Sequence, residues 1–549
     1  MPLATRASTL VALLWICCCL CGVESRAAKK RPLELRRVQL TLPGLPAKVI
    51  PTDLDGDGRQ DLLFILAYTE IETIGVARVE DLVQFTTVIP AVFDRREAQA
   101  YLARTDGGYE RVGEPLALDN VLAVAAGPEG MPPLALTDDG VAEIVLDLQA
   151  ETVLTLRPLI EEPPVIAGSR SFFSSLDWVL DLDGDGDKDV WIPALDGPAL
   201  YLNQDGRIAT SPVQRLSLPG DRRGTAMRHY PLPAVQDLNG DQRPDLLVRS
   251  RYDEHNEMHV LLGQPDGRFA PIYAGDAACT LGESALRFVG PEGEVSTTVE
   301  DLVFFGDLDG NGRAELVTQT KIDPEKTGMR AGMKDAKRPR HTFRFYRLDE
   351  RLRVEEQPYQ EIETEGYSFE ATFGGVEFSQ FIDLDADGRT DLITITLDFS
   401  MFGILKAMAT KRMTIGLNFH VWAQHEDGSF REVEGLDLTE KLRLDMKRFK
   451  IGRLAHFQGD YDGDGRIDFV RFGHGKRITI HLGQPGCRYR AEPDLLLELE
   501  EEPQDLELIR VADYDGDGRS DFSIMRLLPA TSVDVSPPVR IDFYLSGTP

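Results

Sequence analysis

Seven copies of a nine-residue, aspartate-rich segment restrict most strongly how this 549-residue chain can fold. The copies begin at residues 53, 181, 237, 307, 383, 460 and 513, and each has an oxygen-bearing side chain at positions 1, 3, 5 and 9. A short apolar run rich in β-formers follows, as at 62–65 and 392–395. This pattern predicts a tight loop that leads into a β-strand. A regular internal repeat is typical of propellers and solenoids.

The spacing of the oxygen-bearing side chains indicates a metal site in every copy. Ca²⁺ prefers six to eight oxygen ligands, and alternate side chains of a tight loop can point three of them at one centre. Position 7 would add a backbone carbonyl, so its side chain, usually Arg, is expected to be free. Glycine at positions 4 and 6 lets the chain turn without a Cβ clash. We therefore expect Ca²⁺ at about seven sites.

The predicted ligands are Asp53, Asp55, Asp57, Arg59, Asp61, Asp181, Asp183, Asp185, Asp187, Asp189, Asp237, Asn239, Asp241, Arg243, Asp245, Asp307, Asp309, Asn311, Arg313, Glu315, Asp383, Asp385, Asp387, Arg389, Asp391, Asp460, Asp462, Asp464, Arg466, Asp468, Asp513, Asp515, Asp517, Arg519 and Asp521.

The EF-hand begins in the same way, but it needs a bidentate Glu at position 12 and flanking helices. Position 12 of the seven copies is never Glu; the residues there are Phe64, Ile192, Val248, Thr318, Thr394, Arg471 and Ile524. The strand-like runs after position 9 also argue against an EF-hand, which has a helix there. The loops therefore connect strands rather than helices.

A second pattern, a strand followed by a glycine-containing turn, recurs at 201–206, 260–269 and 480–486. One repeat then reads strand, loop, strand, strand, turn, strand, which is the four-stranded meander of a propeller blade. These units resemble FG-GAP/VCBS repeats, the family typified by the integrin α-subunit propeller and many bacterial surface proteins. The resemblance implies a secreted, calcium-binding propeller with an adhesion or assembly role.

Five residues depart from the family pattern. Ala386 and Gln242 replace glycines, Asn239 and Asn311 replace carboxylates, and Glu315 lengthens one ligand. The third and fourth sites have fewer negative charges, so we expect them to bind Ca²⁺ more weakly.

The spacing of the copies predicts eight blades. The first two copies start 128 residues apart, whereas the others start 53 to 77 apart. The long interval contains four strand candidates without an aspartate loop: 121–127, 133–136, 141–146 and 152–156. We interpret it as a blade that has lost its ion; a seven-bladed ring with this region inserted is the alternative. The expected fold is all-β, a single propeller over 33–549, in which a strand at 35–42 closes the last blade.

Charge and the N-terminus bear on partners and location. The chain has 91 acidic and 60 basic residues, and its net charge of −31 disfavours nucleic acid and anionic membranes as partners. Residues 1–28 read as a signal peptide, with a membrane anchor or a lipoprotein as alternatives. No later segment is long and apolar enough to cross a membrane. We expect a secreted protein: periplasmic, cell-surface or extracellular. Cys279 and Cys487, which follow the signal, either pair or stay as thiols.

Two insertions interrupt the repeat. The first, at about 321–342, is basic and contains glycine, and is either a surface hairpin or a docking loop for an acidic partner or a glycan. The second, at about 398–450, predicts an amphipathic helix after Ser400 that either packs on a blade or binds a partner. Within it, 438–449 is either a helix or a strand.

No catalytic motif is found in the sequence. His456, His474 and His481 lie near the sixth copy and are interpreted as scattered structural residues. We expect a non-catalytic binding, structural or adhesion-type surface protein whose partner is a protein or glycan at the cell surface. The alternative is a calcium-dependent, lyase-like polysaccharide enzyme, with a Lys, Arg, His or Tyr base next to Ca²⁺ in a groove.

Overall fold

The computed structural model describes residues 33–68, 91–92, 95–168, 171–173, 176–194, 197–216, 233–250, 257–271, 279–282, 285–289, 295–298, 301–322, 329–348, 355, 357–367, 380–400, 403, 405, 409–410, 412–445, 455–472, 475–504, 509–529 and 538–547. The expected signal peptide, 1–28, lies outside the described residues.

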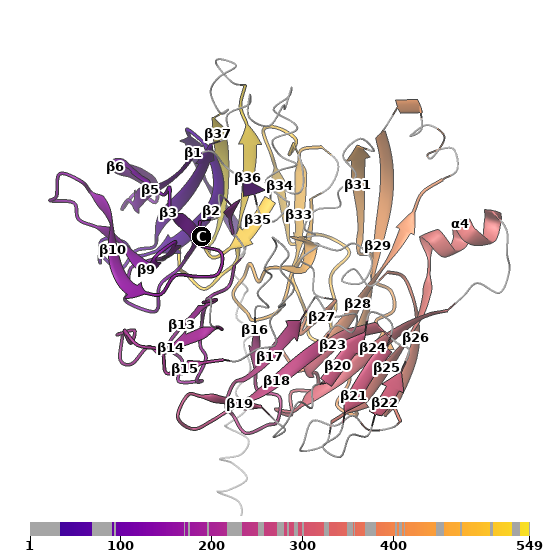
Figure 1. Ribbon diagram of the computed structural model, residues 1–549. Helices are drawn as coiled ribbons and strands as arrows, with labels where there is room; N and C mark the ends of the chain where they lie inside the picture. The colour runs from indigo at the N-terminus through magenta and orange to yellow at the C-terminus, as the bar shows by residue number, and fades with distance from the viewer. Residues whose placement is uncertain are drawn as a thin grey trace, which may run out of the picture.

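Antiparallel sheets are arranged around a ring and form a propeller of eight blades (Figure 1). Blade one contains β2 (Leu45–Thr52), β3 (Asp61–Tyr68), β5 (Arg95–Ala103) and β6 (Tyr109–Ala117). Blade two contains β7 (Val121–Ala125), β8 (Leu134–Thr137), β9 (Gly140–Leu146) and β10 (Leu154–Glu161). Blade three contains β12 (Val179–Leu180), β13 (Asp189–Ile192), β14 (Ala199–Tyr201) and β15 (Gln214–Arg215). Two short strands, β4 (Ala91–Val92) and β11 (Ser171–Phe172), pair separately.

The fourth and fifth blades follow the same order. Blade four contains β16 (Pro233–Gln236), β17 (Asp245–Ser250), β18 (Glu257–Gly263) and β19 (Phe269–Pro271), and it is extended by β20 (Cys279–Gly282), β21 (Ala285–Val289) and β22 (Val295–Thr298). Blade five contains β23 (Asp301–Asp307), β24 (Ala314–Ile322), β25 (Arg340–Arg347) and β26 (Gln360–Glu365).

The last three blades complete the ring. Blade six contains β27 (Phe381–Ile382), β28 (Asp391–Asp398), β29 (Arg412–Gln424) and β30 (Phe430–Glu432), with β31 (Thr439–Asp445) also paired to β29. Blade seven contains the 3₁₀ turn η2 (Ala455–Phe457), β32 (Phe469–Arg471), β33 (Arg477–His481) and β34 (Leu495–Glu498). Blade eight contains β35 (Ile509–Ala512), β36 (Asp521–Leu527) and β37 (Val539–Gly547), and its fourth strand is β1 (Glu34–Leu42).

The eight-bladed, all-β prediction is confirmed, and the seven-bladed alternative is wrong. The region between the first two copies forms β7 to β10, a complete blade rather than an insertion. The strand expected at 35–42 lies within β1, which pairs with β37 in register from Glu34 opposite Gly547 to Leu42 opposite Val539. The two ends of the ring therefore share one sheet, in which β37 is paired on one side with β36 and on the other with β1.

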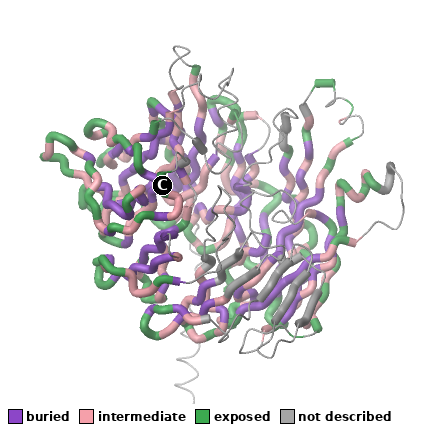
Figure 2. Tube along the Cα trace, viewed as in Figure 1, coloured by how far each residue is buried: buried purple, intermediate pink, exposed green. Residues whose placement is uncertain are grey.

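The core lies between neighbouring blades. Seven of the eight residues of β3 are buried, because a blade strand is covered on both faces by the blades beside it. Phe64 of blade one lies 5.1 Å from Tyr101 and 6.3 Å from Phe543 of blade eight, centroid to centroid, in edge-to-face contacts. Figure 2 shows the buried segments within the blades and the exposed ones at the outer turns. This double burial explains why the strand signals were continuous apolar runs rather than alternating patterns.

Both predicted insertions contain regular structure. The first is a helix, α4 (Met329–Lys337), between β24 and β25. In the second, Gly403, Leu405, Ala409 and Thr410 are helical, and Ser400 Oγ accepts a hydrogen bond from the Gly403 amide as a helix cap would. The segment left open at 438–449 contains the strand β31. None of the helices described is long and apolar enough to cross a membrane.

Candidate metal centres

Six aspartate loops connect the first strand of a blade to the second, as in β2–loop–β3, and the sixth loop follows η2 and is closed by the bridge between Gly459 and Asp468. The carboxylate at position 1 holds the turn together. Asp53 Oδ1 accepts the Gly56 amide at 2.8 Å, and its Oδ2 accepts the Gly58 amide at 2.8 Å. Asp460 does the same for Gly463 and Gly465 at 2.8 and 2.7 Å. Position 1 therefore shapes the loop even without an ion.

The carboxylate at position 9 is buried and ties the loop to the rest of its blade. Asp468 Oδ2 accepts the Tyr461 amide at 2.7 Å, and its Oδ1 accepts the Gly483 amide, next to β33, at 2.8 Å. The position-2 amide donates in the same way in all seven loops. In six of them the second oxygen accepts an amide at the end of the third strand. Glu315 is the exception: its Oε1 accepts a hydrogen bond from the side-chain Nδ2 of Asn311, at 3.5 Å, instead of one from the third strand.

Burial raises the pKa of these position-9 groups. The pKa of Asp468 rises to about 8 and that of Asp521 to about 7, mainly through loss of solvent. The two backbone amides at each carboxylate oppose this shift but do not cancel it. Asp189 and Glu315 have a pKa of about 7, and Asp245 and Asp391 one of about 6, for the same reason. A cation beside such a group would favour its charged form.

In several loops, carboxylates from three of positions 1, 3, 5 and 9 lie close together. Oxygens of Asp53, Asp55 and Asp57 lie within 4.8 Å of one another. The same holds for two further sets, Asp181 with Asp183 and Asp189, and Asp307 with Asp309 and Glu315. An oxygen at position 3 is buried without a hydrogen-bond partner in two loops, Asp385 Oδ1 and Asp515 Oδ1. Buried carboxylate oxygens need a partner, so the loops fit a hard divalent cation such as Ca²⁺.

The arginines at position 7 were expected to have free side chains, but the structure shows them bound. The guanidinium groups of Arg59, Arg389 and Arg466 pair with the position-5 carboxylates of their own loops. Arg466 Nε also donates to the Gly483 carbonyl at 3.1 Å. The arginine is thus an internal counter-ion that holds position 5, and its constant place two residues after that carboxylate is a signal that the sequence contains.

Neighbouring loops touch one another around the ring. A Cβ added to Gly310 of the fourth loop would lie 2.2 Å from the carbonyl oxygen of Gly388 in the fifth. The Ile467 amide of the sixth loop donates to the Leu384 carbonyl of the fifth at 3.0 Å. Similar close approaches join the second loop to the third, the third to the fourth, the sixth to the seventh, and the seventh to the first. The loops form a continuous series that blade two alone interrupts among the described blades.

The left-handed backbone of the loops explains their glycines. Gly58 and Gly465 have φ values of +84° and +86°. The two departures from glycine adopt the same conformation, with φ of 65° at Gln242 and 59° at Ala386. A side chain there costs about 1 kcal/mol relative to glycine. The loop therefore keeps the same backbone conformation even where glycine is replaced by another residue.

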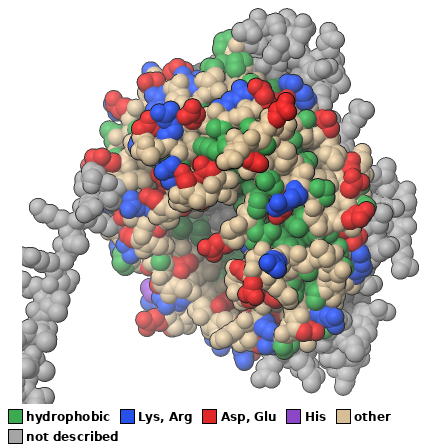
Figure 3. Space-filling model, turned by 90° about the vertical axis from the view of Figure 1, so that its left-hand side faces the viewer, with side chains coloured by type: hydrophobic (Ala, Val, Ile, Leu, Met, Phe, Trp, Pro, Cys, Tyr) green, Lys and Arg blue, Asp and Glu red, His purple; other side chains and the backbone are tan. Residues whose placement is uncertain are grey.

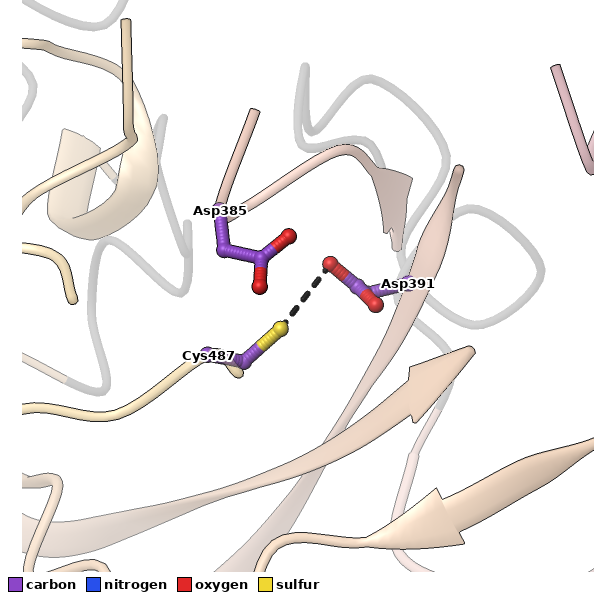
Figure 4. Close-up of side chains that lie close together, drawn as sticks. All are labelled: Asp385, Asp391 and Cys487. Atoms are coloured by element: carbon purple, nitrogen blue, oxygen red, sulfur yellow. Dashed lines mark hydrogen bonds between the residues drawn. The ribbon is translucent and has the colours of Figure 1, made fainter. Parts of the chain in front are cut away.

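One loop has an additional side chain from the next blade. Cys487, in the turn between β33 and β34, places Sγ 3.1 Å from Asp391 Oδ2 of the fifth loop (Figure 4). Cys487 is buried with a free thiol, so it is not in a disulfide, and the side chain of Cys279 lies outside the described residues. Burial and the adjacent Asp391 raise the pKa of the Cys487 thiol.

The two described histidines near the sixth loop, His456 and His481, are both buried. His456 is fully buried among Phe419, Phe469 and Phe472, and its Nε2 lies 3.4 Å from Glu440. His481 is buried and its Nδ1 bonds to the Arg490 carbonyl. His474 lies outside the described residues.

The basic insertion has acidic partners of its own. Lys321 pairs with Asp335 of α4 at 2.9 Å, Lys337 with Asp398 at 3.5 Å, and Arg340 contacts Glu363 at 2.5 Å. On the face drawn in Figure 3, acidic and basic side chains are likewise interspersed. These pairs reduce the charge available to an acidic partner.

Comparisons with known proteins agree with the repeat. A family model described as an FG-GAP-like repeat matches residues 181–248, which include the second and third loops. No curated protein matches the chain. A solved structure concerning recognition of non-reducing terminal N-acetylglucosamine by an Agrocybe aegerita lectin is similar at 13% identity, covering 85% of this chain and 90% of that one, with a TM-score of 0.37. The S. cerevisiae core factor matches at 9% identity, covering 93% of this chain and 61% of its own, with a TM-score of 0.24. Neither score carries an argument about function.

Proposed function

Because this chain is a β-propeller with FG-GAP-like repeats, we propose that it is a secreted calcium-binding protein that acts as a non-catalytic binding or structural scaffold at the cell surface. Its partner is a protein or a glycan. The rigid ring provides the surfaces that bind the partner, and Ca²⁺ holds the loops on these surfaces in one conformation.

One observation supports calcium above all others. In the first, second, fourth and fifth loops three carboxylates come together, and buried oxygens such as Asp385 Oδ1 and Asp515 Oδ1 lack a partner. Without a cation these charges repel, and the buried oxygens lose their hydration. When bound, Ca²⁺ would neutralise the carboxylates. The conformation of the loop itself comes from the chain's own residues: the carboxylate at position 1 accepts the amides of the turn, and the carboxylate at position 9 ties the turn to the blade.

The secretion part of the proposal draws on two features. Residues 1–28 read as a signal peptide. Extracellular calcium modules bind at about 10⁻⁴–10⁻³ M, which suits loops with exposed outer carboxylates. A weak site of this kind would stay empty at cytosolic calcium levels.

The lyase-like alternative needs a basic group beside a loop. The sequence offered three histidines near the sixth loop, but His456 and His481 are buried and held by core contacts. These two histidines are therefore unsuited to act as the base, and we carry the scaffold forward. A depolymerisation assay on anionic polysaccharides separates the two, since a scaffold leaves chain length unchanged.

Thermal unfolding tests the role of calcium. The melting temperature is expected to rise with Ca²⁺ up to millimolar concentrations and to fall in EDTA, because an ion that binds only the folded state stabilises it. Bound calcium measured by atomic emission should approach seven ions per chain. An unchanged melting temperature in EDTA contradicts the proposal.

A pull-down from the native cell envelope tests the binding role. The bait is the full chain, with and without Ca²⁺, beside a variant in which Asp53 and Asp57 become Asn. The scaffold proposal predicts specific partners that depend on Ca²⁺ and weaken in the variant. Equal recovery by the three baits contradicts a calcium-ordered binding surface.

A further inference from the structure

The turn that contains Cys487 is one of a set. In blades one, four, six and seven, the turn after the third strand is closed by a hydrogen bond from its first amide, as from Gln264 to Arg268 and from Gln484 to Arg488. Three of these turns have glycine at the fourth position, namely Gly107, Gly267 and Gly428, with φ between +72° and +81°. The fourth has Cys487, with φ of 53°. A cysteine therefore stands at a left-handed position where its sister turns use glycine.

In blades four and seven this turn position lies against an aspartate loop of the preceding blade. A Cβ added to Gly267 would lie 3.4 Å from Asp183 Oδ2, at position 3 of the second loop. In blade seven the side chain is present. The Cys487 sulfur and oxygens of Asp385 and Asp391 all lie within 4.8 Å of one another. Figure 4 shows the three side chains pointing toward a common point.

The surroundings of this cluster favour an ion rather than a plain hydrogen bond. Asp391 and Cys487 are each only 2% exposed. Asp385 Oδ1 is buried with no hydrogen-bond partner, although its Oδ2 accepts the Gly486 amide at 2.5 Å. The thiol satisfies Asp391 and leaves the Asp385 oxygen unsatisfied. A cation between them would contact both.

We propose that the fifth loop is a mixed thiolate–carboxylate site that binds a thiophilic divalent cation, such as Zn²⁺ or Cd²⁺, in preference to Ca²⁺. Sulfur is a poor ligand for hard cations and a good one for Zn²⁺ and its heavier congeners. The cation replaces the thiol proton, which leaves to solvent. Asp385 and Asp391 supply oxygens, and Asp383 lies in the adjoining carboxylate group. The inference rests on the proposed function only in treating this loop as a cation site.

Cadmium titration of the full chain tests the inference through thiolate-to-metal absorption in the ultraviolet. In about 1 mM Ca²⁺, the wild type should gain this band with one equivalent of Cd²⁺. The band should disappear in Cys487→Gly, which restores the residue of the sister turns, and in Asp385→Asn. It should persist in Cys279→Ser, the matched control for the other cysteine. Circular dichroism of each variant verifies folding.

Three results overturn the inference: no band in the folded wild type, a band that persists in Cys487→Gly, or one that millimolar Ca²⁺ removes. The proposed function is judged separately. Calcium should still raise the melting temperature of Cys487→Gly, because the other loops are intact. Loss of that effect would contradict the calcium proposal and leave the cadmium result standing.

Discussion

The backbone amide of Thr390 donates a hydrogen bond to the carbonyl oxygen of Leu308 at 2.8 Å, and so joins the fifth aspartate loop to the fourth. The Ala314 amide donates in the same way to Leu238, at 3.0 Å, between the fourth loop and the third. Each loop is therefore both a candidate ion site and a contact between blades. Changes in one loop should be felt in the next.

A pair of glycines in the fourth loop tests this contact. Gly310 and Gly312 both have left-handed backbones, so alanine at either should cost about 1–2 kcal/mol. Only Gly310→Ala would also push a Cβ into Gly388, which adds about 1–3 kcal/mol of overpacking. Urea unfolding in saturating Ca²⁺ measures both variants. Equal losses would mean that loop-to-loop packing contributes nothing.

Position 9 should matter to stability even without metal. Asp468→Asn replaces a buried acceptor of two amide bonds with a group that places an N–H₂ against one of them. The free energy of unfolding should fall by about 1–3 kcal/mol in EDTA as well as in Ca²⁺. Asp464→Asn, at position 5 of the same loop, is the control. In EDTA it loses only its partly exposed ion pair with Arg466, about 1 kcal/mol or less, and its larger loss should appear in Ca²⁺. If both variants unfold with the same free energy as the wild type in EDTA, the two amide hydrogen bonds to position 9 contribute nothing to stability, and its role is limited to binding the metal.

The calcium-free protein should be more stable at mildly acidic pH than at pH 8. The pKa of Asp468 is about 8 and those of Asp189, Glu315 and Asp521 are about 7, all above their ordinary values. The folded state then binds more protons than the unfolded one, so stability falls as pH rises through this range. Melting in EDTA between about pH 5.5 and pH 8 measures the slope. A melting temperature that rises with pH in EDTA contradicts the assignment.

Bound calcium should remove that slope. The cation holds the carboxylates in their charged form, so the folded state no longer takes up extra protons. The stabilisation by Ca²⁺ should therefore be larger at pH 8 than at about pH 5.5. The same melts in saturating Ca²⁺ serve as the comparison.

The second loop should bind Ca²⁺ more tightly than the third. It has Asp187 at position 7, where Arg243 in the third loop pairs with the position-5 carboxylate Asp241. Asp187→Arg adds a guanidinium and removes a carboxylate, so affinity should fall on the order of tenfold. Terbium luminescence sensitised by Trp178 and Trp191 of blade three reports the loop in a Trp422→Phe background. An unchanged midpoint means that position 7 has no influence on affinity.

Most of the architecture could be read from local patterns. The glycine and aspartate spacing requires a turn at each of the seven loops, and the apolar runs that follow require buried strands. The long interval between the first two copies predicted β7 to β10 because four strand signals remain after the loop is lost. The helix α4 and the extra strands β20 to β22 were missed. Met329–Lys337 was interpreted as a basic, glycine-containing loop because its lysines, arginine and glycine outweigh its few apolar residues.

The sequence by itself determined the blade, since propensity, turn chemistry and ligand spacing all act over fewer than about twenty neighbouring residues. Only the tertiary structure decided how the loops are coupled. Two contacts show this: the Gly483 amide donates to Asp468, and the Cys487 thiol lies against Asp391. Both depend on the curvature that brings strand ends and adjacent blades within hydrogen-bonding distance. Such contacts have no fixed spacing along the chain, so no local pattern encodes them.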